Sequence, residues 1–195
     1  MVVELCLTGK KLNMENRRDF LKATTLGLAG VPLTTISHLP FLALINGGPV
    51  IKHSDECEAV YVRENTIITF HLSKSTDEMS SISLLSEELI PGSAIPMHKH
   101  LYADEFFLFL SGNGEITIGE IVYPFWPGTT GFVPKDSFHG IRNTGTEKVV
   151  FFFGYSPAGF EGFFRESGTP KGQPFKAKPK PEMEAIAKKY GMVFK

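Results

Sequence analysis

Residues 92–112 read GSAIPMHKHLYADEFFLFLSG and contain two histidines separated by one residue. On a β-strand, residues i and i+2 project to the same face, so His98 and His100 can point at one object. Glu105 follows after a predicted turn and opens the apolar run 106–110, which predicts the next strand. The stretch therefore predicts two adjoining strands that present two imidazoles and one carboxylate.

A second stretch, residues 128–143, reads GTTGFVPKDSFHGIRN and supplies His139 on another predicted strand that leaves a turn. Three imidazoles and one carboxylate are a ligand set suited to a divalent first-row metal. We therefore expect one metal ion to be bound by His98, His100, Glu105 and His139.

The two stretches resemble the two signature motifs of the cupin family. The first motif has Gly, five residues, His-x-His, three or four residues, Glu, six residues and Gly, and it matches at Gly92, His98, His100, Glu105 and Gly112. The second has Gly, five residues, Pro-x-Gly, two residues, His, three residues and Asn, and it matches at Gly128, Pro134, His139 and Asn143. Asp136 stands where the family has its glycine, and we expect the turn to survive because Asp tolerates turn conformations better than most residues.

The resemblance covers roughly residues 55–165 and implies an all-β fold, the cupin jelly-roll β-barrel, with a metal site. It does not imply one reaction, because one fold serves many chemistries. The strand pattern agrees, since short β-branched and aromatic runs alternate with turn residues as in antiparallel sandwiches and barrels. The expected strands cover residues 59–62, 66–72, 81–85, 105–110, 115–118, 121–125, 130–133, 139–142 and 149–155.

The N-terminal region contains NRRDFLK at residues 16–22, which closely matches the twin-arginine export motif. The apolar stretch 23–36 that follows is too short and too rich in Gly and Thr for a stable membrane span. We predict that residues 1–45 are a twin-arginine signal region and that the protein is exported to the periplasm or another extracytoplasmic location. An amphipathic helix with an incidental arginine pair is the alternative, and the sequence leaves open both a start at Met14 and a cleavage after Ala43.

Beyond the signal, residues 46–167 are expected to form the barrel, and residues 168–195 a linker and a C-terminal helix. The run after Tyr155 resembles the closing segment of small cupins of the quercetin-dioxygenase-like type, and we expect a short helix there that packs aromatics on the outside of the barrel. The last helix begins near Pro181 and has one apolar stripe, formed by Met183, Ile186, Ala187 and Tyr190. This stripe is expected to dock on the barrel, with a homodimer contact as the alternative.

Strand alternation predicts which side chains surround the metal. Residues two and four positions after an inward-facing Glu105 also face inward, as does the residue two positions after His139. A later strand carries Phe151 and Phe153 on one face. Met97 and Tyr102 flank the ligands in sequence. We expect these positions to line a substrate pocket, with ordinary barrel core as the alternative for each: Met97, Tyr102, Phe107, Phe109, Ile141, Phe151 and Phe153.

The formal net charge of −1 gives no indication of nucleic acid as a partner, so a small-molecule substrate is expected. Four protein ligands leave one or two open positions on a six-coordinate ion, as a catalytic site requires. Twin-arginine signals export folded proteins, which favours manganese or iron because these ions are more available in the cytoplasm than free copper. Nickel, cobalt and copper also fit the ligands.

The sequence therefore predicts a metal-dependent oxidoreductase of the dioxygenase type, acting on a small aromatic or enolic substrate. The resemblance implies that Glu105 can also leave the metal and act as a base in catalysis. Two alternatives stay open on the same scaffold: a non-catalytic cupin that binds a sugar or another small molecule, and a cupin isomerase or decarboxylase.

Overall fold

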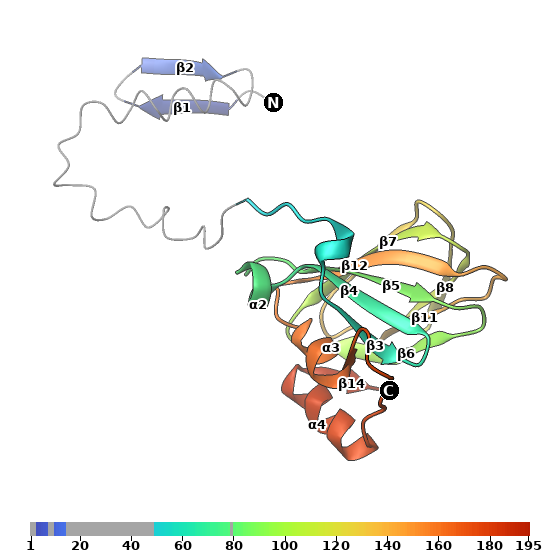
Figure 1. Ribbon diagram of the computed structural model, residues 1–195. Helices are drawn as coiled ribbons and strands as arrows, with labels where there is room; N and C mark the ends of the chain where they lie inside the picture. The colour runs from blue at the N-terminus through green and yellow to red at the C-terminus, as the bar shows by residue number, and fades with distance from the viewer. Residues whose placement is uncertain (1–2, 8–9, 15–48, 79) are drawn as a thin grey trace. The chain divides into compact units, whose positions relative to one another are not determined.

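The computed structural model describes residues 3–7, 10–14, 49–78 and 80–195 (Figure 1). The first two of these segments form an antiparallel ribbon of β1 (Val3–Leu7) and β2 (Lys10–Met14), in a unit separate from the rest of the chain. The arginine pair and the apolar stretch of the predicted export signal lie outside the described residues, so export stays a prediction. In the described segments, no helix combines the length and the apolar character needed to cross a membrane.

Two antiparallel sheets build the barrel, which confirms the predicted jelly-roll class. The larger sheet has the order β10-β7-β12-β5-β4-β3-β13, with bounds β3 (Ala59–Arg63), β4 (Thr66–Leu72), β5 (Leu84–Leu89), β7 (Asp104–Ser111), β10 (Thr130–Val133), β12 (Val149–Ser156) and β13 (Thr169–Pro170). The smaller sheet has the order β14-β6-β11-β8-β9, with bounds β6 (Ala94–His100), β8 (Gly114–Ile118), β9 (Ile121–Phe125), β11 (His139–Arg142) and β14 (Met192–Phe194). The helical segments are a 3-10 turn (Ser54–Glu56), α2 (Lys74–Asp77), α3 (Gly162–Ser167) and α4 (Lys180–Lys189).

The core lies between the sheets, and aromatic side chains fill much of it. On β7 the alternation is as predicted, because Phe107 and Phe109 are buried whereas Leu108 is exposed. Phe109 stacks on Phe125 with ring centroids 3.8 Å apart. Strand β12 lies beside β7 and places three inward pairs opposite one another: Glu105 with Tyr155, Phe107 with Phe153, and Phe109 with Phe151.

Strand β5 begins three residues later than the strand predicted over residues 81–85, since it spans Leu84–Leu89. Its buried side chains are Leu85, Glu87 and Leu89. A glutamate in the middle of the inward row breaks the apolar alternation from which strands are recognised. The apolar pattern therefore ended at Leu85 although the strand continues.

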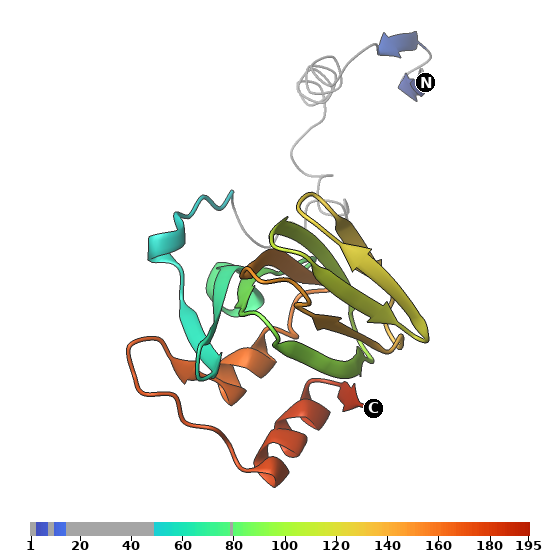
Figure 2. The same ribbon diagram turned by 90° about the vertical axis from the view of Figure 1, so that its right-hand side faces the viewer.

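Two short strands of the C-terminal segment belong to the sheets of the barrel, in addition to the linker and helix predicted over residues 168–195. β13 pairs with β3, and β14 pairs with β6. Helix α4 contacts α3 and β14, and all three lie at one side of the barrel next to the C-terminus (Figure 1 and Figure 2). The predicted apolar stripe of α4 does dock on its own barrel, because Ile186 and Ala187 are buried in the core.

Candidate metal centre

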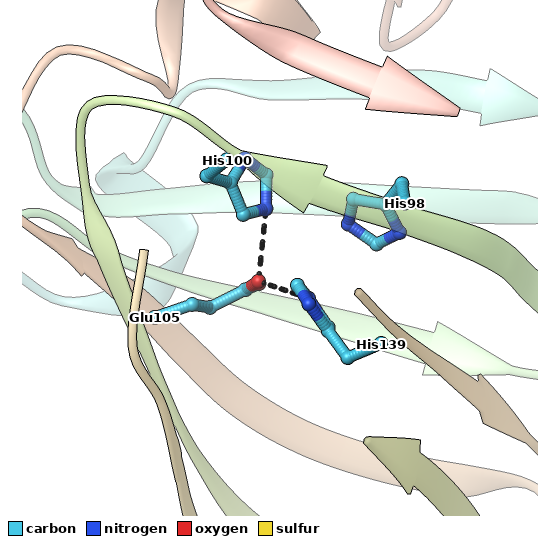
Figure 3. Close-up of side chains that lie close together, drawn as sticks. All are labelled: His98, His100, Glu105 and His139. Carbon is cyan, nitrogen blue, oxygen red and sulfur yellow. Dashed lines mark hydrogen bonds and ion pairs between the residues drawn. The ribbon is translucent and has the colours of Figure 1, made fainter. Parts of the chain in front are cut away.

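Four side chains from three strands converge inside the barrel (Figure 3). His98 and His100 lie on β6, Glu105 lies on β7, and His139 is the first residue of β11. All four are buried, and one ligand atom from each lies within 4.8 Å of those of the other three. The structure thus brings together the complete ligand set that the sequence predicts.

Strand pairing explains why the rings meet. β6 and β11 are neighbours in the smaller sheet, and their register places His139 directly opposite His98. Because side chains directly opposite each other in antiparallel strands share a face, both rings enter the barrel together. His100 follows on the same face of β6, and its ring centroid lies 4.9 Å from that of His98.

The turn before His139 keeps its form without the family's glycine. Asp136 adopts a φ of +66°, in the left-handed region that Asp tolerates better than most residues. Its backbone N–H donates to the carbonyl of His100 at 2.7 Å, and its carboxylate accepts from Lys99 Nζ at 2.6 Å. The turn is therefore tied to the strand that carries the other two histidines.

Two backbone carbonyls fix the tautomers of two imidazoles. His98 Nδ1 lies 2.8 Å from the carbonyl oxygen of Pro96, and His139 Nδ1 lies 3.0 Å from that of Ser137. A carbonyl oxygen can only accept, so each Nδ1–H donates. The Nε2 atom of each neutral ring consequently carries its lone pair toward the centre, which is the arrangement of metal-binding histidines.

The contacts of Glu105 test whether this donor set fits a metal. Its Oε2 lies 2.7 Å from His139 Nε2 and 3.0 Å from His100 Nε2. A carboxylate oxygen facing the lone pair of a neutral Nε2 at this distance is repelled, unless a cation or a proton lies between them. His100 Nδ1 is buried and has no hydrogen-bond partner among the described residues. The residues therefore fit a divalent ion.

The pKa values follow from burial and from mutual contacts. Burial alone would raise the pKa of Glu105, but His100 and His139 hold it well below its usual range. Burial lowers the pKa of His98 to about 4 despite the opposing charge of Glu105. Burial also disfavours the charged form of His139, yet the hydrogen bond that His139 donates to Glu105 raises its pKa. A carboxylate and a neutral His98 are the forms that bind metal.

In the metal-free protein we expect His98 to stay neutral down to about pH 4, and His139 to keep its proton above pH 6.5. The depressed pKa of His98 therefore costs stability as pH falls from 6.5 toward 4, by roughly 3 kcal/mol at about 1.36 kcal/mol per pKa unit. His139 acts in the opposite sense, because it stabilises the fold below pH 6.5 and loses this effect as pH rises through its raised pKa. Ring-nitrogen NMR titration checks the value for His98 and the direction for His139, and protonation of His98 near pH 6.5 would contradict the first.

A cavity of about 220 Å³ opens onto the centre. Its wall includes three of the four metal-site side chains, namely His98, Glu105 and His139. Four of the seven predicted pocket residues also line it: Phe107, Ile141, Phe151 and Phe153. All four are buried, so the metal centre faces an apolar space.

The other three predicted pocket residues lie elsewhere. Met97 is next to His98 in a strand, so alternation turns its side chain to the other face, where Sδ lies beside Gly140. Tyr102 is 67% exposed, and its ring packs against the backbone of Gly191. Phe109 belongs to the inward row but is sealed in the core against Phe125.

The aromatic segment after Tyr155, which the sequence placed on the outside of the barrel, lines the cavity instead. Phe160 has its ring centroid 4.1 Å from that of His100 and lies just before α3. The predicted position of this aromatic segment on the outside of the barrel is therefore wrong, since its residues Phe160, Phe163 and Phe164 line the cavity. Met183 of α4 and the β14 residues Met192 and Phe194 also line it. The Phe-rich run was visible in the sequence, but an apolar run does not indicate which surface of the barrel it covers.

Comparisons with known proteins agree with the fold and the motifs. Residues 85–155 match the family described as Cupin domain. Auxin-binding protein 1 of Arabidopsis thaliana is 26% identical over 115 residues, covering 54% of this chain and 58% of that protein. Dimethylsulfoniopropionate lyase DddW of Ruegeria pomeroyi is 34% identical over 74 residues, covering 38% of this chain and 47% of the lyase. The chain thus spans about half the length of these curated relatives.

Among solved structures, the polyketide cyclase RemF from Streptomyces resistomycificus is similar with a TM-score of 0.50 and 17% identity, over 70% of this chain and 92% of that chain. At this low identity the similarity shows the fold alone. The domain match over residues 85–155, the jelly-roll fold and the two motifs agree with one another and support a cupin domain in this part of the chain.

Proposed function

We propose that this protein is a metal-dependent oxidoreductase of the dioxygenase type that acts on a small aromatic or enolic molecule. The observation that carries the proposal is the apolar cavity that opens directly onto two histidines and the carboxylate of the four-residue metal centre. When bound by His98, His100, Glu105 and His139, a divalent ion such as manganese or iron would supply Lewis-acid and redox chemistry to a substrate's oxygen atoms.

The protein's own residues have separate roles in this proposal. Phe107, Phe151 and Phe153 exclude water from the cavity, which strengthens every electrostatic contact inside it. Glu105 stays ionised, so it can accept the proton of an enol or phenol. Burial and the charge of Glu105 raise the pKa of Tyr155 well above its usual value. Tyr155 therefore keeps its proton and can donate a hydrogen bond in the cavity.

A lyase is the second candidate function. The similarity to dimethylsulfoniopropionate lyase favours it, because that identity of 34% is higher than the 26% identity to auxin-binding protein 1. In a lyase, a base removes a proton and no dioxygen is consumed. The same ionised carboxylate of Glu105 suits that step. The two candidates differ in one requirement that can be measured, which is dioxygen.

The test is substrate conversion and dioxygen uptake by the metal-loaded protein across catechols, flavonols and β-diketones. We expect conversion of at least one member of the panel with dioxygen consumed, and no conversion under strict anaerobic conditions. Conversion that runs equally well without dioxygen would rule out the oxygenase and favour the lyase or an isomerase. Tight binding with no conversion under any metal would instead favour a binding protein.

The Glu105→Gln variant should separate metal binding from catalysis. An amide oxygen is a poorer ligand than a carboxylate, but it can still coordinate, so we expect a substantial share of the metal to remain. An amide cannot accept a proton, so kcat should fall by about 100-fold or more. Metal analysis and turnover of the same preparation check this, with Glu105→Asp as the control that keeps a carboxylate. Turnover within a few-fold of wild type would contradict the role of Glu105 as a base.

A further inference from the structure

The cavity contains an ion pair in addition to the metal centre. Arg63, the last residue of β3, donates from Nη2 to Oε1 of Glu87 on β5. The side chain of Glu87 is only 4% exposed, whereas that of Arg63 is 38% exposed. Both residues line the same cavity as His98 and Glu105. The pair therefore joins a buried carboxylate to a guanidinium that reaches solvent.

Glu87 occupies a position where the barrel core is otherwise apolar. Its cross-strand partners are Phe151 on β12 and Ile68 on β4, both fully buried. Burial raises the pKa of Glu87 to about 7, although Arg63 opposes this and the charge of Glu105 adds to it. Replacing a buried ion pair with apolar residues of similar volume is often neutral or stabilising. A stable barrel therefore does not require an ion pair at this position. A buried carboxylate with a raised pKa in a cavity points instead to ligand binding.

The two groups retain hydrogen-bonding capacity. Arg63 Nε makes a long contact of 3.4 Å to Thr66 Oγ1, and Nη2 contacts Glu87. Within the described parts of the chain, no further hydrogen bond is made by Arg63 Nη1 or Glu87 Oε2. A guanidinium only donates and an ionised carboxylate only accepts. A hydroxyl group can satisfy both at once, by accepting from Arg63 and donating to Glu87.

We propose that Arg63 and Glu87 bind a hydroxyl group of the substrate, away from the metal centre. The substrate is then a ring with adjacent oxygens at one end, held at the metal centre, and a hydroxyl at the other end. The first half of this description rests on the proposed function. An anionic group fits less well, because the charge of Glu87 would repel it. A divalent ion at Glu105 would offset the charge that adds to the effect of burial on the pKa of Glu87, which favours the ionised form of Glu87.

The register of the strands agrees with a ligand of this size. Tyr155 lies opposite Glu105, and Phe151 lies opposite Glu87, on the same strand β12. Four residues of an antiparallel strand span about 13 Å. The side chains of Glu105 and Glu87 both extend from this sheet into the barrel and line one cavity, so a single ligand can contact both sites.

Two catechols with the same number of non-hydrogen atoms test the proposal: 4-(hydroxymethyl)catechol has the distal hydroxyl, and 4-ethylcatechol has a methyl group in its place. Calorimetric titration into the metal-loaded protein under argon measures both dissociation constants without turnover. We expect the hydroxymethyl compound to bind wild type at least about ten-fold more tightly, because an analogue without the hydroxyl leaves buried polar groups unpaired.

The matched variant is Arg63→Met with Glu87→Leu, which removes both charges together and leaves neither unpaired. We expect it to keep its metal, its melting temperature and its affinity for 4-ethylcatechol, and to lose the preference for the hydroxymethyl compound. If the double variant does not fold, Glu87→Gln alone should reduce the preference several-fold.

An unchanged preference in the double variant, or in Glu87→Gln where only that variant folds, would overturn the proposal. So would equal affinities of the two catechols for wild type, or no binding of either. Loss of the oxygenase assignment is a separate outcome, since it concerns dioxygen uptake and leaves the ratio of the two dissociation constants unaffected.

Discussion

The double variant His98→Ala/His139→Ala is expected to purify without stoichiometric metal and to melt roughly 5–10 °C below the metal-loaded wild type. An ion that binds only the folded state stabilises it by about 2.7 kcal/mol when present at 100 times its dissociation constant. In a domain of this size, each kcal/mol corresponds to about 2–4 °C in Tm. The two histidines supply half of the ligand set, so their loss removes most of this stabilisation.

The matched control is His71→Ala. His71 lies on β4 outside the metal centre, and its Nε2 contacts Ser86 Oγ at 2.9 Å. This variant should keep its metal. Elemental analysis and thermal denaturation with and without a chelator check both variants, and the chelator should bring wild type close to the double variant. Stoichiometric metal in the double variant would refute the ligand assignment.

Asn143→Ala should destabilise the fold by about 3 kcal/mol or more, because each buried polar group left unpaired costs about 1–3 kcal/mol. Asn143 is 1% exposed. Its Nδ2 donates to the carbonyls of Leu89 and Glu147, both at 2.8 Å, and its Oδ1 accepts from the N–H of Gly145 at 3.0 Å. The amide thus ties the end of β11 to β5 and to the following turn.

Urea denaturation of the metal-free protein measures this effect separately from metal binding. The control is Asn65→Ala, because Asn65 is exposed in the turn between β3 and β4 and its loss should change stability by less than about 0.5 kcal/mol. A loss below about 1 kcal/mol for Asn143→Ala would show that the three backbone groups find other partners.

The features that the sequence predicted are those with a local physical cause. Two histidines at i and i+2 share a strand face whatever the strand pairs with, so the His98 and His100 geometry followed from spacing alone. The inward row of β7 followed in the same way from Glu105. The turn at Asp136 was predicted from the backbone conformations that Asp tolerates, and its φ of +66° agrees.

The features that the sequence did not predict depend on pairing between distant segments. β14 has only three residues, too few for a pattern, and its place beside β6 is decided by the docking of α4. Phe160 covers His100 because the chain folds back over the barrel after β12. Glu87 was missed for a different reason, since a buried charge contradicts the apolar alternation by which core strands are recognised.

Anomalous diffraction from crystals of the metal-loaded wild type tests the central claim most directly. The account predicts one metal peak per chain, between the Nε2 atoms of His98, His100 and His139 and the carboxylate of Glu105, with a coordination position open to the cavity. A folded protein that holds stoichiometric metal at another position, or that shows no peak between these four side chains after loading with manganese or iron, would contradict the account.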